Sequence, residues 1–399
     1  MDSIVAYTDE IDDLEEAAKE IFSQTAGFEF KKNSLAIVMA EDETDYPELY
    51  RLLSVRWSFP VIGCTALSLI LGEQGYCGTG ISVMILSADD CKFEAGVTDA
   101  LSTDNYAGMI RSHYERTQTK LGEEVKLIIS YGVIVTQEDN VSGDDVVMTL
   151  DKVSGHKPIF GGLASDGFNF TESRVFFNDK VVKNGLVFAL VSGNIKPIWI
   201  CRNSITNKAN FSYEITKSEG NQVFRLGGGS FIETMKKAQF QVDKTNVMGD
   251  YLLSPFVVTI TQPDGETVEV SRNLSVLNHE KGSGIFLGGM PERSYLGIGI
   301  ISRDDVQNSV NDALETIVRE INSDSEYKYK TFLCVTCAAR FLALASNLKA
   351  EGETCRDHLP EGVSLQGMYA YGEFCPVKGK TTGKDYNMFN NFTFAILAI

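Results

Sequence analysis

The stretch KTFLCVTCAARFLALA, residues 330–345, passes from one regular pattern directly into another. Residues 330–336 form a short run rich in apolar and β-branched side chains, which predicts a buried strand. Apolar residues over 338–349 recur with the helical period, which predicts a helix directly after it. An earlier stretch has the same order, with a strand at 126–131 (KLIISY) before a helix at 142–153. Alternating units of this kind favour mixed sheets with helices on their faces.

The repetition extends beyond these two units. Two blocks share the order strand, helix, strand, helix, and they lie about 200 residues apart (330 against 126). A displacement of this size favours two similar domains, since solenoid repeats have periods of about 20–50 residues. The alternative is that an α/β chain shows this order by chance. The blocks comprise 93–97, 105–119, 126–131 and 142–153 in the first half, and 295–301, 304–321, 330–336 and 338–349 in the second.

We therefore predict an α/β (mixed α+β) protein of two similar domains. Each is expected to hold a mixed, largely antiparallel sheet with helices packed on its faces. The expected domains are 1–220, which includes a short acidic N-terminal helix, and 221–399. The junction is expected in the polar, turn-rich segment 205–228. Ser230 with Glu233, and Ser302 with Asp305, predict capped starts for two helices of the second half.

Composition restricts the classes of partner. The 399 residues carry a formal net charge of −18, which repels phosphate backbones and anionic lipid headgroups. Nucleic acid and membrane surfaces are therefore not expected as partners. The N-terminus lacks the pattern of a signal peptide, and no apolar run approaches the roughly 18–20 residues that cross a bilayer. The expectation is a cytoplasmic protein whose eight cysteines are reduced thiols.

Four residues near the C-terminus raise two cysteine-based alternatives. Cys334 and Cys337 have redox-pair spacing at a strand-to-helix junction, but they lack the Trp and Pro of the usual redox motif. With Cys355 and His358 they also approach zinc-site spacing. A helix over 338–349 would carry the chain roughly 18 Å from Cys337, which argues against convergence on a metal. We expect structural or ligand-lining thiols, and no metal.

Several polar residues lie in apolar, glycine-flanked contexts. Asp166 follows a Gly-Gly strand, Arg340 begins the helix after strand 330–336, and Glu373 interrupts GMYAYGEFCPV, residues 367–377. Buried charges are costly unless they are paired or hydrogen-bonded. One interpretation is a structural ion pair between Glu373 and Arg340. The other is a polar ligand site at strand ends, where α/β sheets commonly bind ligands.

These residues also carry a resemblance to a known family. PVIGCTALSLI, KPIFGGLASDGFNF and GLVFALVSG in the first half, with VFRLGGGSFIETM, CVTCAARF, GMYAYGEFCP and NNFTFAIL in the second, resemble the motifs of FIST proteins. The resemblance covers about residues 35–398 and includes paired FIST N and FIST C domains. It implies intracellular sensory domains that bind small ligands, possibly amino acids. Members often accompany histidine kinases, chemotaxis receptors or cyclic-nucleotide output domains, and some relatives bind haem and sense nitric oxide.

The family's motifs can be carried over by position. Its Cys and Arg fall on Cys337 and Arg340, and its Gly-Glu on Gly372 and Glu373. Its Asn-x-Thr falls on Asn391 and Thr393, and the Gly-Gly-x-Ala-x-Asp element on Gly161, Gly162, Ala164 and Asp166. The chain departs from the family in two places. Asn390 stands where many relatives have a His, and GCTALSL lacks the Gly-Glu of an early turn.

The leading expectation is a non-enzymatic, ligand-binding sensor without a cofactor. In this hypothesis Arg340 holds a ligand carboxylate and Glu373 accepts from a ligand ammonium or orients Arg340. Asn391, Thr393 and Tyr371 would add hydrogen bonds, and a small zwitterion such as an amino acid would fit. Two alternatives stay open. One is a haem-based gas sensor, and the other is an enzyme that uses Cys337 as a thiol nucleophile.

Overall fold

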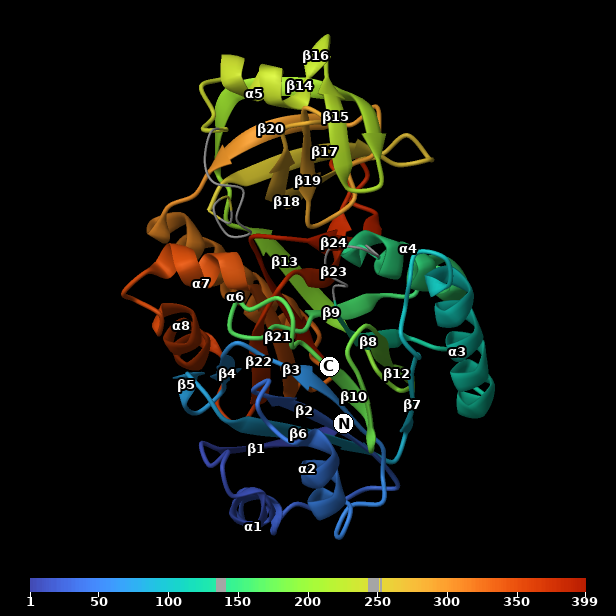
Figure 1. Cartoon of the computed structure of the whole chain (residues 1–399). Helices are drawn as coiled ribbons and strands as arrows, with labels where there is room; N and C mark the ends of the chain where they lie inside the picture. The colour runs from blue at the N-terminus through green and yellow to red at the C-terminus, as the bar shows by residue number, and fades with distance from the viewer. Residues whose placement is uncertain (134–140, 243–250, 252) are drawn as a thin grey trace.

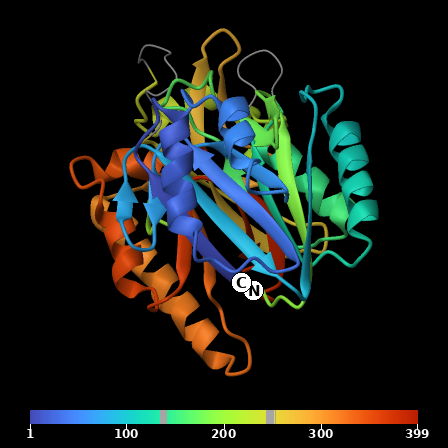
Figure 2. The same ribbon diagram turned by 90° about the horizontal axis from the view of Figure 1, so that it is seen from below.

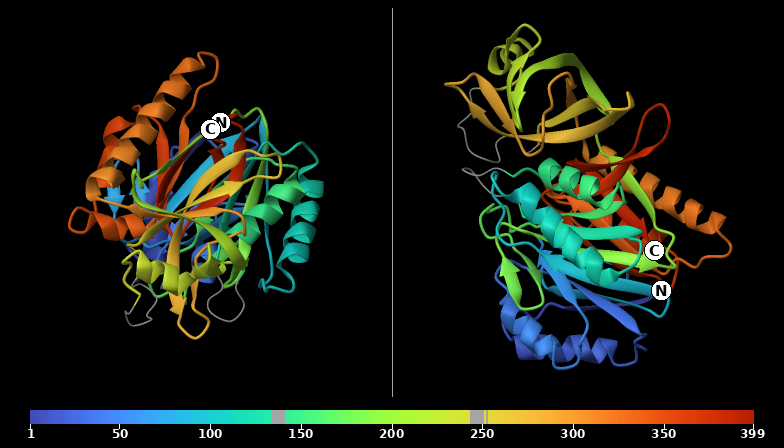
Figure 3. Two further views of the ribbon diagram at one scale, coloured as in Figure 1. Left: turned by 90° about the horizontal axis from the view of Figure 1, so that it is seen from above. Right: turned by 90° about the vertical axis from the view of Figure 1, so that its right-hand side faces the viewer.

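A computed structural model describes residues 1–133, 141–242, 251 and 253–399. Within these residues the body of the molecule consists of three six-stranded sheets, and a separate seven-stranded sheet lies at one end (Figure 1). Figures 2 and 3 show the two chain termini close together on the body. Each body sheet contains one parallel strand pair, and its other pairs are antiparallel. The predicted fold class, mixed α+β with largely antiparallel sheets and helices on their faces, is confirmed.

Three consecutive segments of the described chain repeat one order of elements. The first comprises β1 (Asp2–Thr8), α1 (Leu14–Thr25), β2 (Asn33–Ala40), α2 (Tyr46–Leu53), β3 (Val61–Thr65), hairpin β4 (Leu69–Leu71) and β5 (Gly75–Cys77), and β6 (Ile81–Ala88). The second comprises β7 (Cys91–Val97), α3 (Tyr106–Leu121), β8 (Leu127–Gly132), α4 (Gly143–Ser154), β9 (Ile159–Leu163), hairpin β10 (Val175–Phe177) and β11 (Lys180–Val182), and β12 (Leu186–Gly193).

The third segment has the same plan with one large insertion. It comprises β13 (Ile198–Asn203), α6 (Arg303–Ser323), β21 (Thr331–Cys337), α7 (Ala338–Leu344), α8 (Ala350–His358), β22 (Ser364–Ala370), hairpin β23 (Glu373–Lys378) and β24 (Asp385–Asn390), and β25 (Thr393–Ala398). The predicted repetition is therefore found between the second and third segments, with one correction. The counterpart of β7 is β13, whereas the predicted counterpart 295–301 forms β20 (Tyr295–Ile300) in the sheet of the insertion. The first segment is a further copy that the sequence comparison missed.

The hairpins exchange between sheets in a cycle. Hairpin β4–β5 extends the sheet of the third segment by pairing with β22, hairpin β10–β11 pairs with β3 of the first, and hairpin β23–β24 pairs with β9 of the second. Each sheet is thus completed by a neighbouring segment. The exchange brings Glu373, at the start of β23, opposite Gly162 of β9.

Alternation along the strands explains how the body packs. Leu35, Leu127 and Leu333, from the three sheets, point into one shared apolar core. The residues that follow them, Ala36, Ile128 and Cys334, point outward beneath helices of their own segments. Because both faces of these strands are buried, their sequences are nearly continuous apolar runs.

The insertion leaves the body between β13 and α6. It comprises β14 (Asn207–Glu219), β15 (Gln222–Leu226), β16 (Gly229–Ser230), α5 (Phe231–Lys237), β17 (Pro255–Thr261), β18 (Thr267–Asn278), β19 (Ser283–Phe286) and β20 (Tyr295–Ile300). It has its own apolar core and sits on one end of the body (Figures 1 and 3). The predicted junction segment 205–228 is thus largely β14 and β15. The predicted domain boundary between residues 220 and 221 stays a prediction. In the structure this position lies in the turn that connects β14 to β15.

Local details correct two predicted elements. Ser230 and Ser302 form the predicted capping boxes. The predicted helix 338–349 is instead two helices, since α7 ends at Leu344 and Ala345 adopts a φ of +52°. The break lets α8 fold back against β21, and packing thereby overrides the continuous helical pattern. Similarly, β25 begins at Thr393 rather than 391, because Phe392 takes a φ of +56° in the preceding turn.

Candidate functional site

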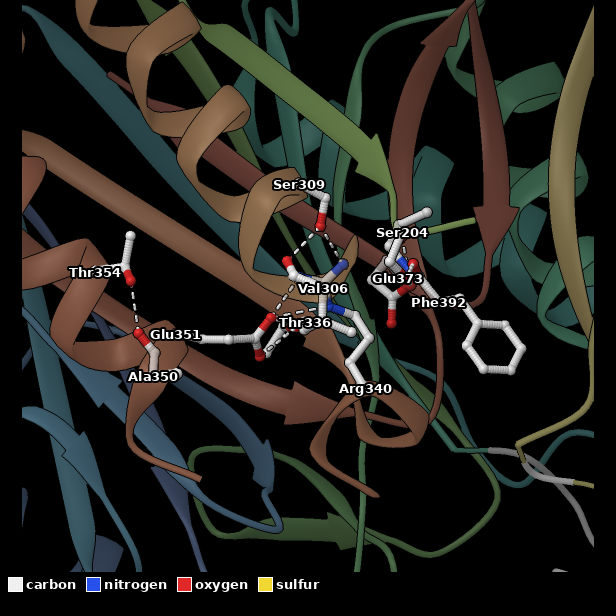
Figure 4. Close-up of polar contacts among 11 residues, drawn as sticks. Ser204, Val306, Ser309, Thr336, Arg340, Ala350, Glu351, Thr354, Glu373 and Phe392 are labelled. Carbon is white, nitrogen blue, oxygen red and sulfur yellow. Dashed lines mark hydrogen bonds and ion pairs between the residues drawn. The ribbon is translucent and has the colours of Figure 1, made fainter. Parts of the chain in front are cut away.

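Arg340 lies in α7, and its side chain is fully buried. Its Nε donates to Glu351 Oε1 at 2.9 Å, and its Nη2 donates to the same oxygen. The remaining contacts run from Nη1 to Ser309 Oγ at 2.9 Å and from Nη2 to the Val306 carbonyl at 3.2 Å (Figure 4). All three guanidinium nitrogens therefore donate to protein groups, which is the arrangement of a closed structural ion pair.

Glu351 of α8 completes this pair. Its carboxylate also accepts from the Thr336 hydroxyl, at 3.1 Å to Oε2. The interpretation that Arg340 pairs with Glu373 is wrong, because the break after α7 brings Glu351 to the guanidinium instead (Figure 4). The ligand-clamp role of Arg340 stays a prediction.

Glu373 presents the opposite situation. Its side chain is fully buried, and Oε2 accepts from the Thr393 hydroxyl at 2.5 Å and from the Thr393 N–H at 3.3 Å. Within the described chain, Oε1 has no hydrogen-bond partner. Burial raises the pKa of this carboxyl well above its usual range, against the hydrogen bonds from Thr393 that lower it. This environment therefore favours the neutral form of the carboxyl over the charged form.

The backbone at Gly372 positions this carboxyl. Gly372 adopts a φ of +147°, and a Cβ there would lie 2.2 Å from the Phe389 ring. Only glycine fits such a position without strain. The Gly-Glu pair is thus explained locally, because the glycine allows the chain to turn into β23 with its first side chain inside the protein.

Cys337, the last residue of β21, lies near the Glu373 carboxyl and is 2% exposed. Burial and the nearby Glu373 raise the pKa of the Cys337 thiol well above its usual range. A buried, protonated thiol is a poor nucleophile. Its contacts fit the expected structural thiol better than the enzymatic alternative.

Asn391 lies in the β24–β25 turn and is fully buried. Its Oδ1 accepts from the Asn273 N–H of β18 at 3.3 Å, while its Nδ2 has no partner among the described residues. The turn is also held by Ser204, whose hydroxyl donates to the Phe392 carbonyl at 2.7 Å (Figure 4). Asn391 therefore joins the body to the insertion, next to Thr393.

Asp166 and Tyr371 form a separate cluster. The Tyr371 hydroxyl donates to Asp166 Oδ1 at 2.5 Å. The same carboxylate accepts from the N–H groups of Phe170, Thr171 and Glu172 at 2.6–2.8 Å. These contacts organise the loop after β9, in which Phe170 stacks on Tyr371. The structure therefore brings four predicted site residues together: Cys337, Glu373, Asn391 and Thr393. Asp166 and Tyr371 instead stabilise the loop after β9.

A cavity of about 240 Å³ opens on the other side of Thr393. It lies where β13, β23, β24 and β25 meet β18 of the insertion. Its lining mixes both signs of charge with amides, a thiol and an indole: Trp199, Ile200, Cys201, Arg202, Asn203, Glu269, Pro376, Val377, Lys378, Asp385, Asn390 and Thr393. Thr393 is the predicted site residue that both lines this cavity and donates to Glu373.

Sequence reasoning missed most of this lining. Cys201, Arg202 and Asn203 belong to a strand that was not predicted, and Glu269 comes from the insertion. Asn390 was noticed only as a departure from a family His. The short apolar run IWIC, residues 198–201, which is rich in β-branched and aromatic side chains, could have indicated a strand. Its position beside the hairpin β23–β24 required the tertiary structure.

A second buried ion pair was also missed. Arg272 of β18 donates from Nη2 to Asp144 Oδ1 of α4 at 2.8 Å, and from Nη1 to the Phe389 carbonyl at 2.8 Å. These contacts join the insertion to two elements of the body.

Among the described residues no group of three or more His, Cys, Asp or Glu side chains could hold a metal ion. None of the described helices is both long and apolar enough for a membrane span.

Comparison with known proteins gives two family matches. The model of the FIST N domain matches residues 34–229, and that of the FIST C domain matches residues 233–376. No curated protein sequence matches the chain. Two solved structures of cyanuric acid hydrolase are similar over 99% and 100% of this chain and 98% of their own. Their identities are 10% and 7% and their TM-scores 0.36 and 0.38; the second is from A. caulinodans.

Proposed function

This chain belongs to the FIST family, and from that premise we propose that it is a non-enzymatic sensor that binds a small zwitterion such as an amino acid. FIST domains are associated with signal transduction and small-ligand sensing. The single observation that carries the proposal is the polar cavity beside Thr393, which opens where the body meets the insertion. Its volume, about 240 Å³, suits a small ligand rather than a nucleotide or a haem.

The lining supports a ligand with charges of both signs. Lys378 and Arg202 are available to a carboxylate, while Glu269 and Asp385 are available to an ammonium group. These charges are partly exposed and lie in surface pairs such as Lys378 with Asp385 at 3.3 Å, so they can exchange partners at little cost. The fully buried Arg340 already donates to Glu351, Ser309 and Val306, and is less suited to a new partner.

Binding at this position would reach both parts of the molecule. Glu269 belongs to the insertion, whereas Asn390 and Thr393 belong to the body. A ligand that contacts both would favour one relative arrangement of the two, which is the requirement for a conformational signal. We propose that the signal passes in the cytoplasm to a separate partner, such as a kinase, chemotaxis or cyclic-nucleotide output protein.

Isothermal titration of the full chain against the twenty common amino acids tests this proposal. We expect at least one to bind, and we expect Lys378→Ala and Asn390→Ala each to weaken it by about tenfold, the loss of one good polar contact. Lys384→Ala is the matched control, because Lys384 pairs with Asp264 and does not line the cavity. Absence of binding across the panel, or wild-type affinity in both cavity variants, would overturn the proposal.

A further inference from the structure

Cys201 and Cys375 form a pair of thiols in hydrogen-bond contact at the wall of this cavity. Cys201 lies on β13 and Cys375 on β23, so the pair joins strands of two different body sheets. Cys201 is partly exposed and lines the cavity, whereas Cys375 is 1% exposed behind it. A small molecule in the cavity can therefore reach one thiol directly, and the second thiol lies within reach of the first.

The surroundings of Cys201 favour its thiolate. The hydrogen bond from Cys375 lowers the pKa of Cys201, and the nearby cation of Arg202 acts in the same direction, while burial acts against them. By contrast, burial raises the pKa of Cys64 and Cys77. Because the thiolate is the reactive form of cysteine, Cys201 combines the two properties that reactivity needs, namely thiolate character and access.

A second thiol pair provides an internal comparison. Cys334 of β21 and Cys355 of α8 are also in hydrogen-bond contact, but both are fully buried and neither lines the cavity. Contact with Cys334 and burial raise the pKa of Cys355 well above its usual range. The two thiol pairs thus differ in their access to the cavity, which one member of the first pair has and neither member of the second has.

We propose that Cys201 and Cys375 form a reversible, peroxide-reactive dithiol that opens onto the cavity. In the first step the Cys201 thiolate attacks one oxygen of a hydroperoxide. The O–O bond breaks, hydroxide or alkoxide leaves and takes a proton from solvent, and Cys201 becomes a sulfenic acid. In the second step the Cys375 sulfur attacks the Cys201 sulfur. The S–O bond breaks, water leaves with the Cys375 proton, and a disulfide joins β13 to β23. A dithiol reductant restores both thiols by thiol–disulfide exchange.

Treatment of the full chain with hydrogen peroxide near neutral pH tests this proposal. After quenching, free thiols are alkylated in denaturant and the peptides are mapped by mass spectrometry. We expect a linked peptide pair containing Cys201 and Cys375 that disappears after dithiothreitol. Cys334 and Cys355 should be recovered as alkylated thiols, and the Cys201–Cys375 pair should be oxidised at least about tenfold faster.

Two variants separate the steps. In Cys375→Ser, Cys201 should stop at the sulfenic acid, which a dimedone probe labels. In the matched control Cys355→Ser, the Cys201–Cys375 disulfide should form as in the wild type. Oxidation of the buried pair at the same rate, or an unreactive Cys201 in the wild-type protein, would overturn the proposal. The wild-type measurement decides even where a variant does not fold.

Discussion

Glu351 and Glu373 are both buried acids near Arg340, yet their environments differ completely. Glu351 accepts from Arg340 and Thr336, so its charge is paired within a closed network. Thr393 donates to one carboxylate oxygen of Glu373, and the same Thr393 separates Glu373 from the cavity that it lines. A buried charge that the protein satisfies completely is explained by stability alone. An incompletely satisfied acid beside a cavity needs a further explanation, and the ligand binding that we propose would supply one.

The largest expected effect concerns the closed network. Replacing Arg340 by Met leaves the Glu351 carboxylate buried and unpaired, and we expect the free energy of unfolding to fall by about 3–5 kcal/mol. Urea denaturation measures this loss. The double variant Arg340→Met/Glu351→Leu should recover most of it, because neither charge then remains. Equal stabilities of the single and double variants would show that the pair is not coupled.

An intermediate effect is expected at Thr393. Thr393→Val removes the hydroxyl that donates to Glu373 at 2.5 Å, and we expect a loss of about 1–3 kcal/mol in the free energy of unfolding. Thr354→Val is the control, because the Thr354 hydroxyl donates to a helix carbonyl, that of Ala350. A loss at Thr393 no larger than that at Thr354 would contradict the special position of Glu373.

The smallest effect is expected for Glu373→Gln, and it depends on pH. An unfolded Glu loses its proton near pH 4.5, whereas the folded protein keeps the Glu373 proton to a higher pH. The unfolded state then binds fewer protons, so this residue's contribution to stability falls as pH rises above about 4.5. At pH 4 the variant and the wild type should therefore agree within about 0.5 kcal/mol. Above that pH the variant should gain relative to the wild type, as denaturation at several pH values would measure.

Glu266 supplies a control of opposite sign. The Thr382 hydroxyl and the N–H groups of Thr267, Thr381 and Thr382 lower its pKa to about 2. Its contribution to stability is present above the unfolded pKa near 4.5 and is lost as pH falls toward 2. Glu266→Gln should consequently lose stability relative to the wild type as pH rises through this window. The same pH response in both variants would refute the assigned difference between the two acids.

Much of the local structure could be predicted from periodicity. Strands such as Pro255–Thr261 and helices such as Tyr106–Leu121 lie close to their predicted positions, because apolar patterns report which faces are buried. The first repeat was missed, and the helix over 338–349 was wrong in its second half. In both places the structure that forms depends on packing between segments that are distant in the sequence. A local apolar pattern carries no information about such packing.

The candidate site was predictable only in part. Motifs identified Glu373, Asn391, Thr393 and Cys337, which the structure does bring together. The partner of Arg340 was not predictable, because Glu351 approaches it only through the break at Ala345. Cys201 was equally hidden, since nothing in its own strand indicates Cys375 as a neighbour.

The sequence by itself determined the fold class, the polar residues worth attention and the glycine that turns Glu373 inward. These properties follow from short-range constraints: side-chain periodicity, backbone strain and the cost of a buried charge. Tertiary structure alone decided which acid pairs with Arg340, which thiols touch, and where the cavity opens. The pairing of β13 with β25 brings together residues as far apart in the sequence as Cys201 and Thr393. Contacts of that kind depend on how whole sheets assemble.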